Sequence, residues 1–415
     1  MTAPISRVHN EKPPRDGWWT QPAVIEAVHR PLNSASSLPG PFFSEPSVWD
    51  REFERIFVPS WHLIGREDEL PKPGDFLTTD VAGSGVMIVR NGEGRLRAFH
   101  NVCRHRGTRI LDADAGSGLR RFLCPYHAWT YDLDGRLKGT PHMADAAHFD
   151  RDEYGLHPVR LETWRGFMFV TLDESLGSVR EQLAPLERRA APYPLERLRR
   201  AHRVVYDVEA NWKLVVQNAN ECYHCPGVHP QLVKLTPYRS GEEDLRRGPV
   251  FGGWMDFVRG VSTLSSTEGT PRASFPELSK DDRGRVYYYV LYPNNFLSLL
   301  PDYVTLDRFL PMGPGRTRVI FDLYVDRDEQ DPGTDAMDFW DTTNRQDWHI
   351  CELAHRGSRS VAYRQGRYSS EEEVVHMVDS FYLTRMGLVG ADRGSSRRRG
   401  HPSVASKSKR RARRT

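Results

Sequence analysis

Two short motifs, Cys103-x-His105 and Cys124-x-x-His127, constrain this 415-residue chain more than any other feature. Each motif offers one thiolate and one imidazole, and eighteen residues separate the two motifs. Both sit beside segments with hairpin patterns, so two loops can converge on one metal centre. Zinc sites favour Cys-x-x-Cys and His-x3-His spacings, which the order found here does not match. Zinc is therefore the less favoured alternative.

The mixed ligand set fits an iron–sulfur cluster better. In a [2Fe–2S] cluster of the Rieske type, two thiolates hold one iron and two imidazoles hold the other. Because neutral imidazoles replace charged thiolates, the reduction potential rises to about −150 to +300 mV. A cysteine and a histidine on each of two loops can clamp such a cluster from both sides. The sequence therefore predicts a one-electron carrier at Cys103, His105, Cys124 and His127.

A second set of candidate ligands lies in the stretch NWKLVVQNANECYHCPGVHP. A helix over residues 211–225 would place Glu221 and His224 on one face. Pro226 cannot continue that helix easily. The break would let His229 return toward His224, whereas two residues five apart on an unbroken helix would diverge.

A third ligand is expected from a helix over residues 335–356. Two histidines need an anionic partner to form the 2-His-1-carboxylate site of Fe(II), which leaves positions open for O2. On a helical wheel Asp347 falls within an apolar arc that also contains Phe339 and Cys351. A buried carboxylate must be paired, hydrogen-bonded or bound to a metal. Asp347 is therefore the predicted carboxylate ligand.

Each of these residues also has an ordinary explanation. Cys222-x-x-Cys225 could be half of a zinc knuckle, but the sequence has no second Cys-x-x-Cys. Taken alone, His224, His229 and Asp347 would more often be satisfied core residues than ligands. The upstream cluster changes that balance, because reductive activation of O2 needs electrons delivered singly.

The pattern along the chain predicts an α+β protein with about two domains. A β-rich domain is expected at 61–173 and a larger mixed domain at 174–390, with 1–60 partly disordered and packed on the second domain. The first 40 residues are expected to be loosely ordered. The expected elements are hairpins at 85–90 with 95–99 and at 129–133 with 136–138, a buried strand at 165–172, helices at 48–56, 176–200, 211–225 and 335–356, and strands at 202–208, 286–291, 303–309 and 317–326.

Composition limits the location and the partners. Five cysteines, odd in number and unevenly placed, argue against a disulfide framework. No apolar run approaches the roughly 20 residues that cross a bilayer, and the N-terminus lacks an apolar signal segment, so we expect a cytoplasmic protein that uses no membrane. Residues 391–415 hold ten Lys and Arg and one Asp. That basic tail is expected to be disordered and solvated, and nucleic-acid binding through it is the less favoured alternative.

CRHRG, CPYHAWTY, NWKLVVQNANECYHCPGVHP and WDTTNRQD resemble motifs of the Rieske non-haem iron oxygenases, and the resemblance spans about residues 40–390. It implies a β-rich Rieske domain followed by a helix-grip catalytic domain, as in the oxygenase (alpha) component. It pairs Cys103 with Cys124 on one iron, and His105 with His127 on the other. Iron at both sites, O2 and a small organic substrate would then make the chain an enzyme.

The same resemblance assigns roles in the second site. His224, His229 and Asp347 match the ligands of the mononuclear iron. Glu221 matches the acidic residue that links His224 to a cluster histidine, His127, across a subunit boundary, where many members carry Asp. The resemblance further implies a homotrimer, with a beta subunit possible, and a reductase or ferredoxin fed by NAD(P)H.

Two substrate classes rank nearly level. The segments around ECYHC and WDTTNRQD look closest to members that demethylate quaternary amines related to glycine betaine, whereas ring hydroxylation of an aromatic acid is equally common in the family. An electron-transfer Rieske protein without oxygenase activity is the remaining alternative. Candidates for an aromatic cage around a cation are Trp254, Phe257, Tyr287, Tyr288, Tyr289, Tyr292 and Tyr303. Candidates for binding a substrate carboxylate are Arg259, Arg308 and Arg316.

Overall fold

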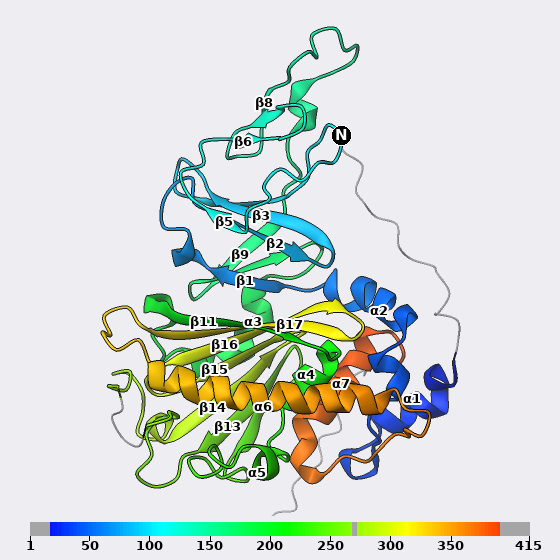
Figure 1. Cartoon of the computed structure of the whole chain (residues 1–415), viewed down its shortest axis with the longest axis vertical. Helices are drawn as coiled ribbons and strands as arrows, with labels where there is room; N and C mark the ends of the chain where they lie inside the picture. The colour runs from blue at the N-terminus through cyan, green and yellow to red at the C-terminus, as the bar shows by residue number, and fades with distance from the viewer. Residues whose placement is uncertain (1–16, 268–271, 391–415) are drawn as a thin grey trace, which may run out of the picture.

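The computed structural model describes residues 17–267 and 272–390, and these form two parts stacked along the long axis (Figure 1). The first part is small and built from three antiparallel sheets; the second is a seven-stranded antiparallel sheet with helices packed on it. The predicted order, a small β-rich part followed by a larger mixed part, is confirmed. The limits proposed for the two domains, residues 61 and 174, stay a prediction.

The small part contains both predicted hairpins. One lies in a sheet of order β4-β3-β2-β5 and the other in a sheet of order β6-β7-β8, while a third sheet of order β1-β10-β9 faces the large part. The predicted buried strand is β10, all five residues of which are buried. The strands are β1 (His62–Arg66), β2 (Phe76–Val81), β3 (Ser84–Arg90), β4 (Leu96–His100), β5 (Ala115–Gly116), β6 (Phe122–Leu123), β7 (Thr130–Tyr131), β8 (Leu137–Gly139), β9 (Arg160–Trp164) and β10 (Phe167–Thr171).

The large sheet has the order β11-β17-β16-β15-β14-β13-β12. Apolar side chains cover both faces, because residues alternate between two core clusters along each strand. The strands are β11 (Leu198–Val208), β12 (Glu242–Arg247), β13 (Val250–Asp256), β14 (Arg285–Leu291), β15 (Asn295–Leu299), β16 (Val304–Gly313) and β17 (Arg316–Asp326).

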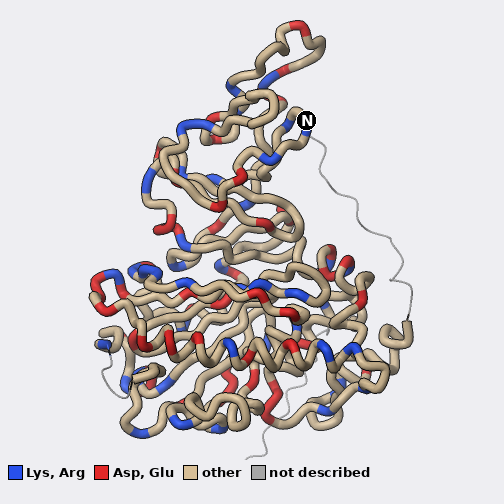
Figure 2. Tube along the Cα trace, viewed as in Figure 1, with Lys and Arg blue, Asp and Glu red and all other residues tan. Residues whose placement is uncertain are grey.

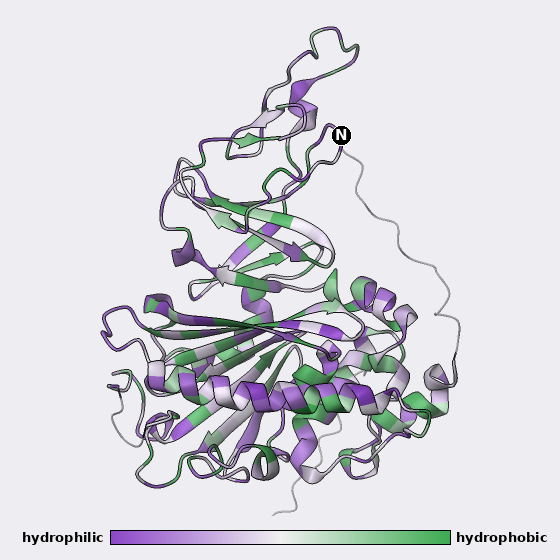
Figure 3. Ribbon diagram, in the orientation of Figure 1, coloured by the Kyte–Doolittle hydropathy of each residue, from purple (hydrophilic) through white to green (hydrophobic). Residues whose placement is uncertain are grey.

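Helices pack on both faces of this sheet. The long helix α6 lies across one face together with α4 and α7, and its outward side is hydrophilic (Figures 1 and 3). Helix α3 contributes to the core on the other face. The bounds are α3 (Val179–Ala190), α4 (Trp212–Ala219), α5 (Cys225–Val228), α6 (Thr334–Ser358) and α7 (Glu373–Arg385).

Two predicted helices end earlier than expected. The helix predicted over 176–200 is α3 alone, because Pro192 and Pro194 lie beyond its end and the chain continues as β11. The helix predicted over 211–225 is α4, which ends at Ala219. The sequence also gave no signal for β13, whose Val-Phe-Gly-Gly-Trp run weakens strand propensity at its two glycines.

The described part of the N-terminal segment is ordered and packs on the large part. Its helices bury Ile25 and Val28, so the expected loose order is wrong from residue 17 onward. Glu52 is fully buried and accepts hydrogen bonds from the Trp212 indole (2.8 Å) and the Tyr382 hydroxyl (2.7 Å). The elements are α1 (Pro22–His29), α2 (Pro46–Glu52) and a π-turn at Phe53–Phe57.

The charge and the hydropathy of the described residues relate to two predictions, those on nucleic-acid binding and on membranes. In Figure 2 basic and acidic residues are interspersed along the described chain. Among the described helices, none combines the length and the apolarity that crossing a bilayer demands. The basic tail at 391–415 lies outside the described residues.

Candidate cluster and iron sites

The four predicted cluster ligands lie together at the tips of two loops. Cys103 and Cys124 are free, buried thiols. The rings of His105 and His127 are 4.7 Å apart between centroids, and His105 stacks on Trp129 at 4.8 Å. The Nδ1 atoms of both histidines are buried without a hydrogen-bond partner among the described residues. Two thiols and two unpartnered imidazole nitrogens facing one another fit a [2Fe–2S] cluster of the Rieske type.

Each ligand loop is tied into a turn by its own backbone. The Gly107 N–H donates to the Cys103 carbonyl (3.0 Å), and Gly107 has a φ of +73°, which glycine adopts without strain. In the second loop the Ala128 N–H donates to the Cys124 carbonyl (3.1 Å), and the Cys124 N–H donates to the Trp129 carbonyl (2.8 Å). These bonds hold each cysteine and histidine pair on the same side of its loop.

Tyr131 adds a group that the sequence analysis missed. Its hydroxyl is 3.4 Å from the Cys103 sulfur and accepts a hydrogen bond from the Arg104 N–H (3.1 Å). Burial raises the pKa of the Cys103 thiol, whereas the hydrogen bond with Tyr131 lowers it. Hydrogen bonds to cluster sulfurs tune the reduction potential. Its position within CPYHAWTY was the only signal available in the sequence.

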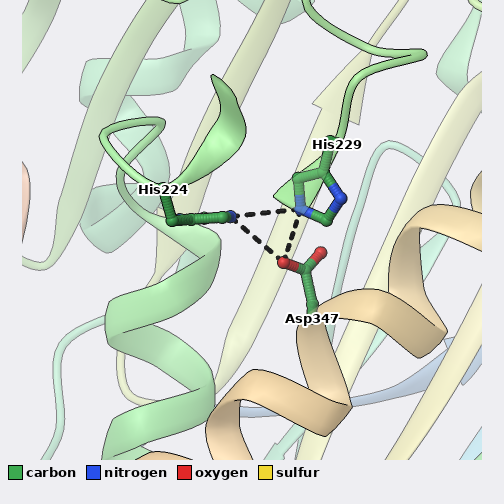
Figure 4. A group of neighbouring side chains, drawn as sticks. All are labelled: His224, His229 and Asp347. Carbon is green, nitrogen blue, oxygen red and sulfur yellow. Dashed lines mark hydrogen bonds and ion pairs between the residues drawn. The ribbon is translucent and has the colours of Figure 1, made fainter. Parts of the chain in front are cut away.

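The three predicted iron ligands converge beside α6, the helix that carries Asp347 (Figure 4). His224 Nε2 and His229 Nε2 are 3.1 Å apart, and they lie 3.1 and 2.8 Å from Asp347 Oδ1. Metal–ligand bonds of about 2.1 Å at right angles would place donor atoms about 3.0 Å apart. The triangle therefore fits one face of an octahedral ferrous site. Among the described residues, these three form the one group of His, Cys, Asp and Glu side chains close enough to hold a single ion.

The local chain conformation differs from the predicted helix. Because α4 ends at Ala219, Glu221 and His224 lie in a loop rather than on one helical face. The Glu221 carboxylate turns this loop by accepting hydrogen bonds from the N–H groups of Tyr223 and His224 (the latter 3.1 Å). His229 follows directly after α5, so a single short helical turn separates the two histidines.

Further hydrogen bonds fix the orientation of both histidines. His224 Nδ1 lies 2.6 Å from Glu221 Oε1, and His229 Nδ1 lies 2.7 Å from Gln346 Oε1. Gln231 donates in turn to the same Gln346 oxygen (2.9 Å). Partners of this kind set the tautomer and the ring direction of metal-binding histidines. The sequence analysis missed both glutamines, because neither residue type marks a metal site by itself.

The electrostatics of the triad follow from its contacts. Burial lowers the pKa of His224, but hydrogen bonds with Asp347 and Glu221 raise it to about 9. Burial raises the pKa of Asp347, whereas the two histidines lower it below its usual value. Without a metal, Asp347 is therefore ionised and His224 is protonated. A divalent ion binding here takes the place of that proton.

The cysteines in this loop depart from the sequence expectation. Cys222 and Cys225 are joined in a disulfide, with Cα atoms 4.9 Å apart, although the cysteine count argued against a disulfide framework. The tight turn places the two side chains within bonding distance. The alternative of a zinc knuckle at these cysteines is disfavoured, since their sulfurs are bonded to each other.

A cavity of about 450 Å³ contains the triad, and aromatic rings form much of its wall. Of the predicted cage residues, only Tyr288 turns its ring toward it. Trp254 borders the cavity, but it pairs with Tyr287 on β14, and both rings belong with Tyr289 to the core on the other face of the sheet, because side chains alternate along each strand. The aromatic residues of the wall on the cavity face are Tyr238, Tyr288, Phe296, Phe309, Trp340 and Trp348.

The cavity wall is rich in carboxyl groups. Seven carboxyl side chains line it against two arginines, Arg239 and Arg246, both of which are more than half exposed and paired with glutamates. The predicted arginines do not line it: Arg308 bonds to the Ile64 carbonyl (2.7 Å) on the other side of the sheet, and Arg316 pairs with Asp207. The lining carboxyl residues are Glu221, Glu242, Glu243, Asp307, Asp347, Glu371 and Glu373.

Comparison with known protein families finds two domain families in this chain. The model of the Rieske [2Fe-2S] domain matches residues 60–150, and that of the ring-hydroxylating alpha subunit, catalytic domain, matches residues 195–388. The fold and its two sites thus define a terminal oxygenase of the Rieske type. The chain belongs to the Rieske non-haem iron oxygenases, whose members use a [2Fe–2S] cluster and a mononuclear iron and take electrons from a reductase or ferredoxin.

Several individual proteins are similar to this chain over most of their length. The glycine betaine monooxygenase oxygenase subunit of Chromohalobacter salexigens is 33% identical over 86% of this chain and 87% of its own. The carnitine monooxygenase oxygenase subunit of Escherichia coli K12 is 30% identical over 81% of this chain and 88% of its own. A quaternary ammonium Rieske monooxygenase solved with L-carnitine superposes with a TM-score of 0.74 at 26% identity, covering 87% of this chain and 98% of that one. Naphthalene 1,2-dioxygenase of Rhodococcus shares the fold, with a TM-score of 0.73 at 21% identity over 88% of this chain and 99% of that one.

Proposed function

We propose that this oxygenase removes an N-methyl group from a small quaternary amine of the glycine betaine type. One oxygen atom of O2 would be inserted into an N-methyl C–H bond, and the other would leave as water, with two electrons and two protons supplied. The resulting N-hydroxymethyl group then breaks down to formaldehyde and a tertiary amine. Two relatives that are at least 30% identical, a glycine betaine monooxygenase and a carnitine monooxygenase oxygenase subunit, support this substrate class.

The observation that carries the proposal is the charge of the cavity. Acidic residues outnumber basic ones in the wall, and both arginines are exposed and already paired with glutamates, so the cavity favours a cation over an anion. Aromatic faces next to the carboxyl groups suit a trimethylammonium group, which offers no hydrogen-bond donor. An aromatic acid would need a basic partner, and neither Arg308 nor Arg316 reaches the cavity.

The chain's own residues divide the work between two sites. We propose that Cys103, Cys124, His105 and His127 hold the cluster, and that His224, His229 and Asp347 hold Fe(II). When bound, that iron supplies the binding and reductive activation of O2. Glu221 orients the His224 ring because its carboxylate accepts a hydrogen bond from the Nδ1–H group of that ring. The aromatic wall excludes water and presents the substrate methyl group to the triad.

We further propose a homotrimer in the cytoplasm, fed by an NAD(P)H-dependent reductase or ferredoxin, with a beta subunit possible. In Figure 1 the β6–β8 end of the small part points away from α5, at whose two ends His224 and His229 lie. This arrangement favours electron delivery from a neighbouring subunit, with Glu221 bridging His224 and the neighbour's cluster. A related quaternary ammonium monooxygenase is described with inter-subunit electron transfer. An electron-transfer protein without oxygenase activity is not favoured, because the iron ligands converge inside a substrate-sized cavity.

A single-turnover experiment tests the substrate class without knowledge of the reductase. Iron-loaded protein is reduced with dithionite, desalted without oxygen, and mixed with O2 and one candidate substrate. We expect formaldehyde from glycine betaine, carnitine or choline, and no hydroxylated product from benzoate or naphthalene. Hydroxylation of the aromatic compounds without formaldehyde from the amines would overturn the proposal.

A further inference from the structure

We propose that Asp307 is the buried counter-charge that recognises the ammonium group of the substrate within the iron cavity. This inference rests on the proposed function and deepens it, because it assigns charge recognition to one residue. No metal ligand is involved. Three features of Asp307 support this role: the direction of its side chain, its missing hydrogen-bond partner, and its neighbours in the cavity wall.

The strand geometry places Asp307 on the cavity wall. Side chains alternate along β16, so Thr305, Asp307 and Phe309 face the cavity while Leu306 and Arg308 face the opposite core. Asp307 therefore stands midway along the wall, between a small polar residue and an aromatic ring. The iron ligand Asp347 lines the same cavity.

Aromatic side chains flank Asp307 across both neighbouring strands. Its partner on β15 is Phe296 and its partner on β17 is Phe321, and paired residues of adjacent strands share a face. Phe296 also lines the cavity and stacks on Tyr288 with ring centroids 5.8 Å apart. The carboxyl group thus sits within an apolar, aromatic surround, which strengthens any charge interaction it makes.

Oδ1 of the Asp307 carboxyl has no hydrogen-bond partner among the residues that the structure describes. The residue is 6% exposed, and this oxygen is buried. Asp322 shows the contrast: on the neighbouring strand it is also buried, but Arg203 donates to it at 2.6 Å and Arg308 at 3.3 Å. Burying a polar group without a partner costs free energy. Asp307 therefore weakens the fold, and a role in packing does not explain it.

A cationic ligand is the partner that this position suits. The two arginines of the wall are already paired with Glu371 and Glu373, and both are largely exposed. Burial, together with the carboxylates of Asp322 and Asp347, raises the pKa of Asp307 well above its usual value, and a cation nearby counteracts that shift. A bound ammonium group lets it ionise and form a charge pair inside the aromatic wall.

Binding to matched ligands isolates this charge interaction. Glycine betaine and 3,3-dimethylbutanoate have nearly the same shape, but the second carries carbon in place of the charged nitrogen. Choline and 3,3-dimethylbutan-1-ol form a second pair of the same kind. Dissociation constants for all four are measured by calorimetry on the iron-loaded full chain without oxygen. We expect the wild-type protein to prefer each ammonium compound over the isostere that has carbon in place of the charged nitrogen by about tenfold or more.

The variants decide whether Asp307 causes that preference. Asp307→Asn keeps the shape and Asp307→Ser removes bulk, and both should bring the preference close to unity by weakening the cations selectively. Thr305→Val is the matched control on the same strand face: it alters polarity without charge, so the preference should be kept. An equal loss of affinity for the cation and its isostere in Asp307→Asn would overturn the inference and indicate a structural role or a site for water.

Other outcomes are equally decisive. Equal binding of each cation and its isostere by the wild-type protein would overturn the inference without any variant. If neither neutral variant folds, the carboxyl stabilises the sheet, and the inference fails. If the wild-type protein binds neither glycine betaine nor choline, the proposed function fails as well. If Asp307→Asn still binds the amines and keeps the preference for the ammonium compound over its carbon isostere, the inference about Asp307 fails, while the proposed function stands.

Discussion

The two metal sites are built in opposite ways. All four cluster ligands lie within residues 103–127, on two loops of a small β-rich part. The iron ligands come from the two ends of α5 and from α6, and Asp347 is 118 and 123 residues from the two histidines in sequence. A local motif therefore specifies the first site, whereas the tertiary fold assembles the second.

The histidines of the two sites face their metals with different ring nitrogens. His105 and His127 present Nδ1, which has no hydrogen-bond partner among the described residues, whereas His224 and His229 present Nε2 and have the other nitrogen, Nδ1, held by Glu221 and Gln346. The iron site is thus preorganised by protein contacts, whereas the cluster site is completed by its metal. We infer that the two sites can be emptied independently, with different consequences for the fold.

The largest effect is expected from His224→Ala. Losing one of three ligands should abolish turnover and lower the iron content from about three to about two atoms per chain. The visible and EPR spectra of the cluster should remain. Iron analysis together with the EPR spectrum of the reduced protein measures both. Loss of the cluster spectrum in this variant would contradict the independence of the sites.

Cys124→Ser provides the reciprocal test. It should remove the cluster and its spectrum and abolish turnover, while about one iron per chain stays bound at the triad. Because the cluster completes its own site, the small part should also become more sensitive to proteolysis. A small part that stays as resistant as in the wild-type protein would show that its hairpins need no metal.

A smaller effect is expected from Glu221→Gln, which keeps the shape of the side chain but removes its charge. Losing the carboxylate partner of His224 Nδ1 should slow turnover about 10- to 100-fold while iron remains bound. Glu221→Asp, which restores the charge on a shorter side chain, should recover part of the rate. The single-turnover rate with a pre-reduced cluster is the measurement. An unchanged rate in both variants would argue against any role in electron delivery.

Gln346→Leu tests the other histidine and should have a weaker effect. It leaves His229 Nδ1 without its acceptor and removes one of the two acceptors of the Gln231 amide, the other being the Thr343 hydroxyl, so iron affinity should fall about tenfold. Competition with a chelator gives the affinity, and the cluster spectrum is the internal control. Arg345→Leu, which removes an exposed side chain paired with Asp341 on the same helix, is the matched variant and should leave iron affinity unchanged.

The same contrast explains which parts of the fold and of the sites can be predicted from the sequence. The cluster loops and both hairpins were predictable, because their contacts lie within a few tens of residues and their turns carry glycine. Asp347 was found because α6 is long enough for its apolar face to show. The loop conformation of Glu221 was not predictable, since its own carboxylate turns the chain where helix periodicity seemed to continue. Asp307 gave no signal, because an acidic residue in a strand reads as solvent-facing until the sheet is assembled.

The smallest effect is expected at the cluster, from Tyr131→Phe. The hydroxyl next to the Cys103 sulfur stabilises negative charge there, so its loss should lower the reduction potential. One hydrogen bond of about 1.4 kcal/mol corresponds to about 60 mV in a one-electron couple. Redox titration followed by EPR measures the shift, and the iron content of the triad should not change. Because Tyr131 is fully buried, the variant keeps the ring packing, and a change in potential reports the hydroxyl alone. A potential unaltered within about 10 mV would mean that this hydroxyl serves the Arg104 N–H rather than the cluster.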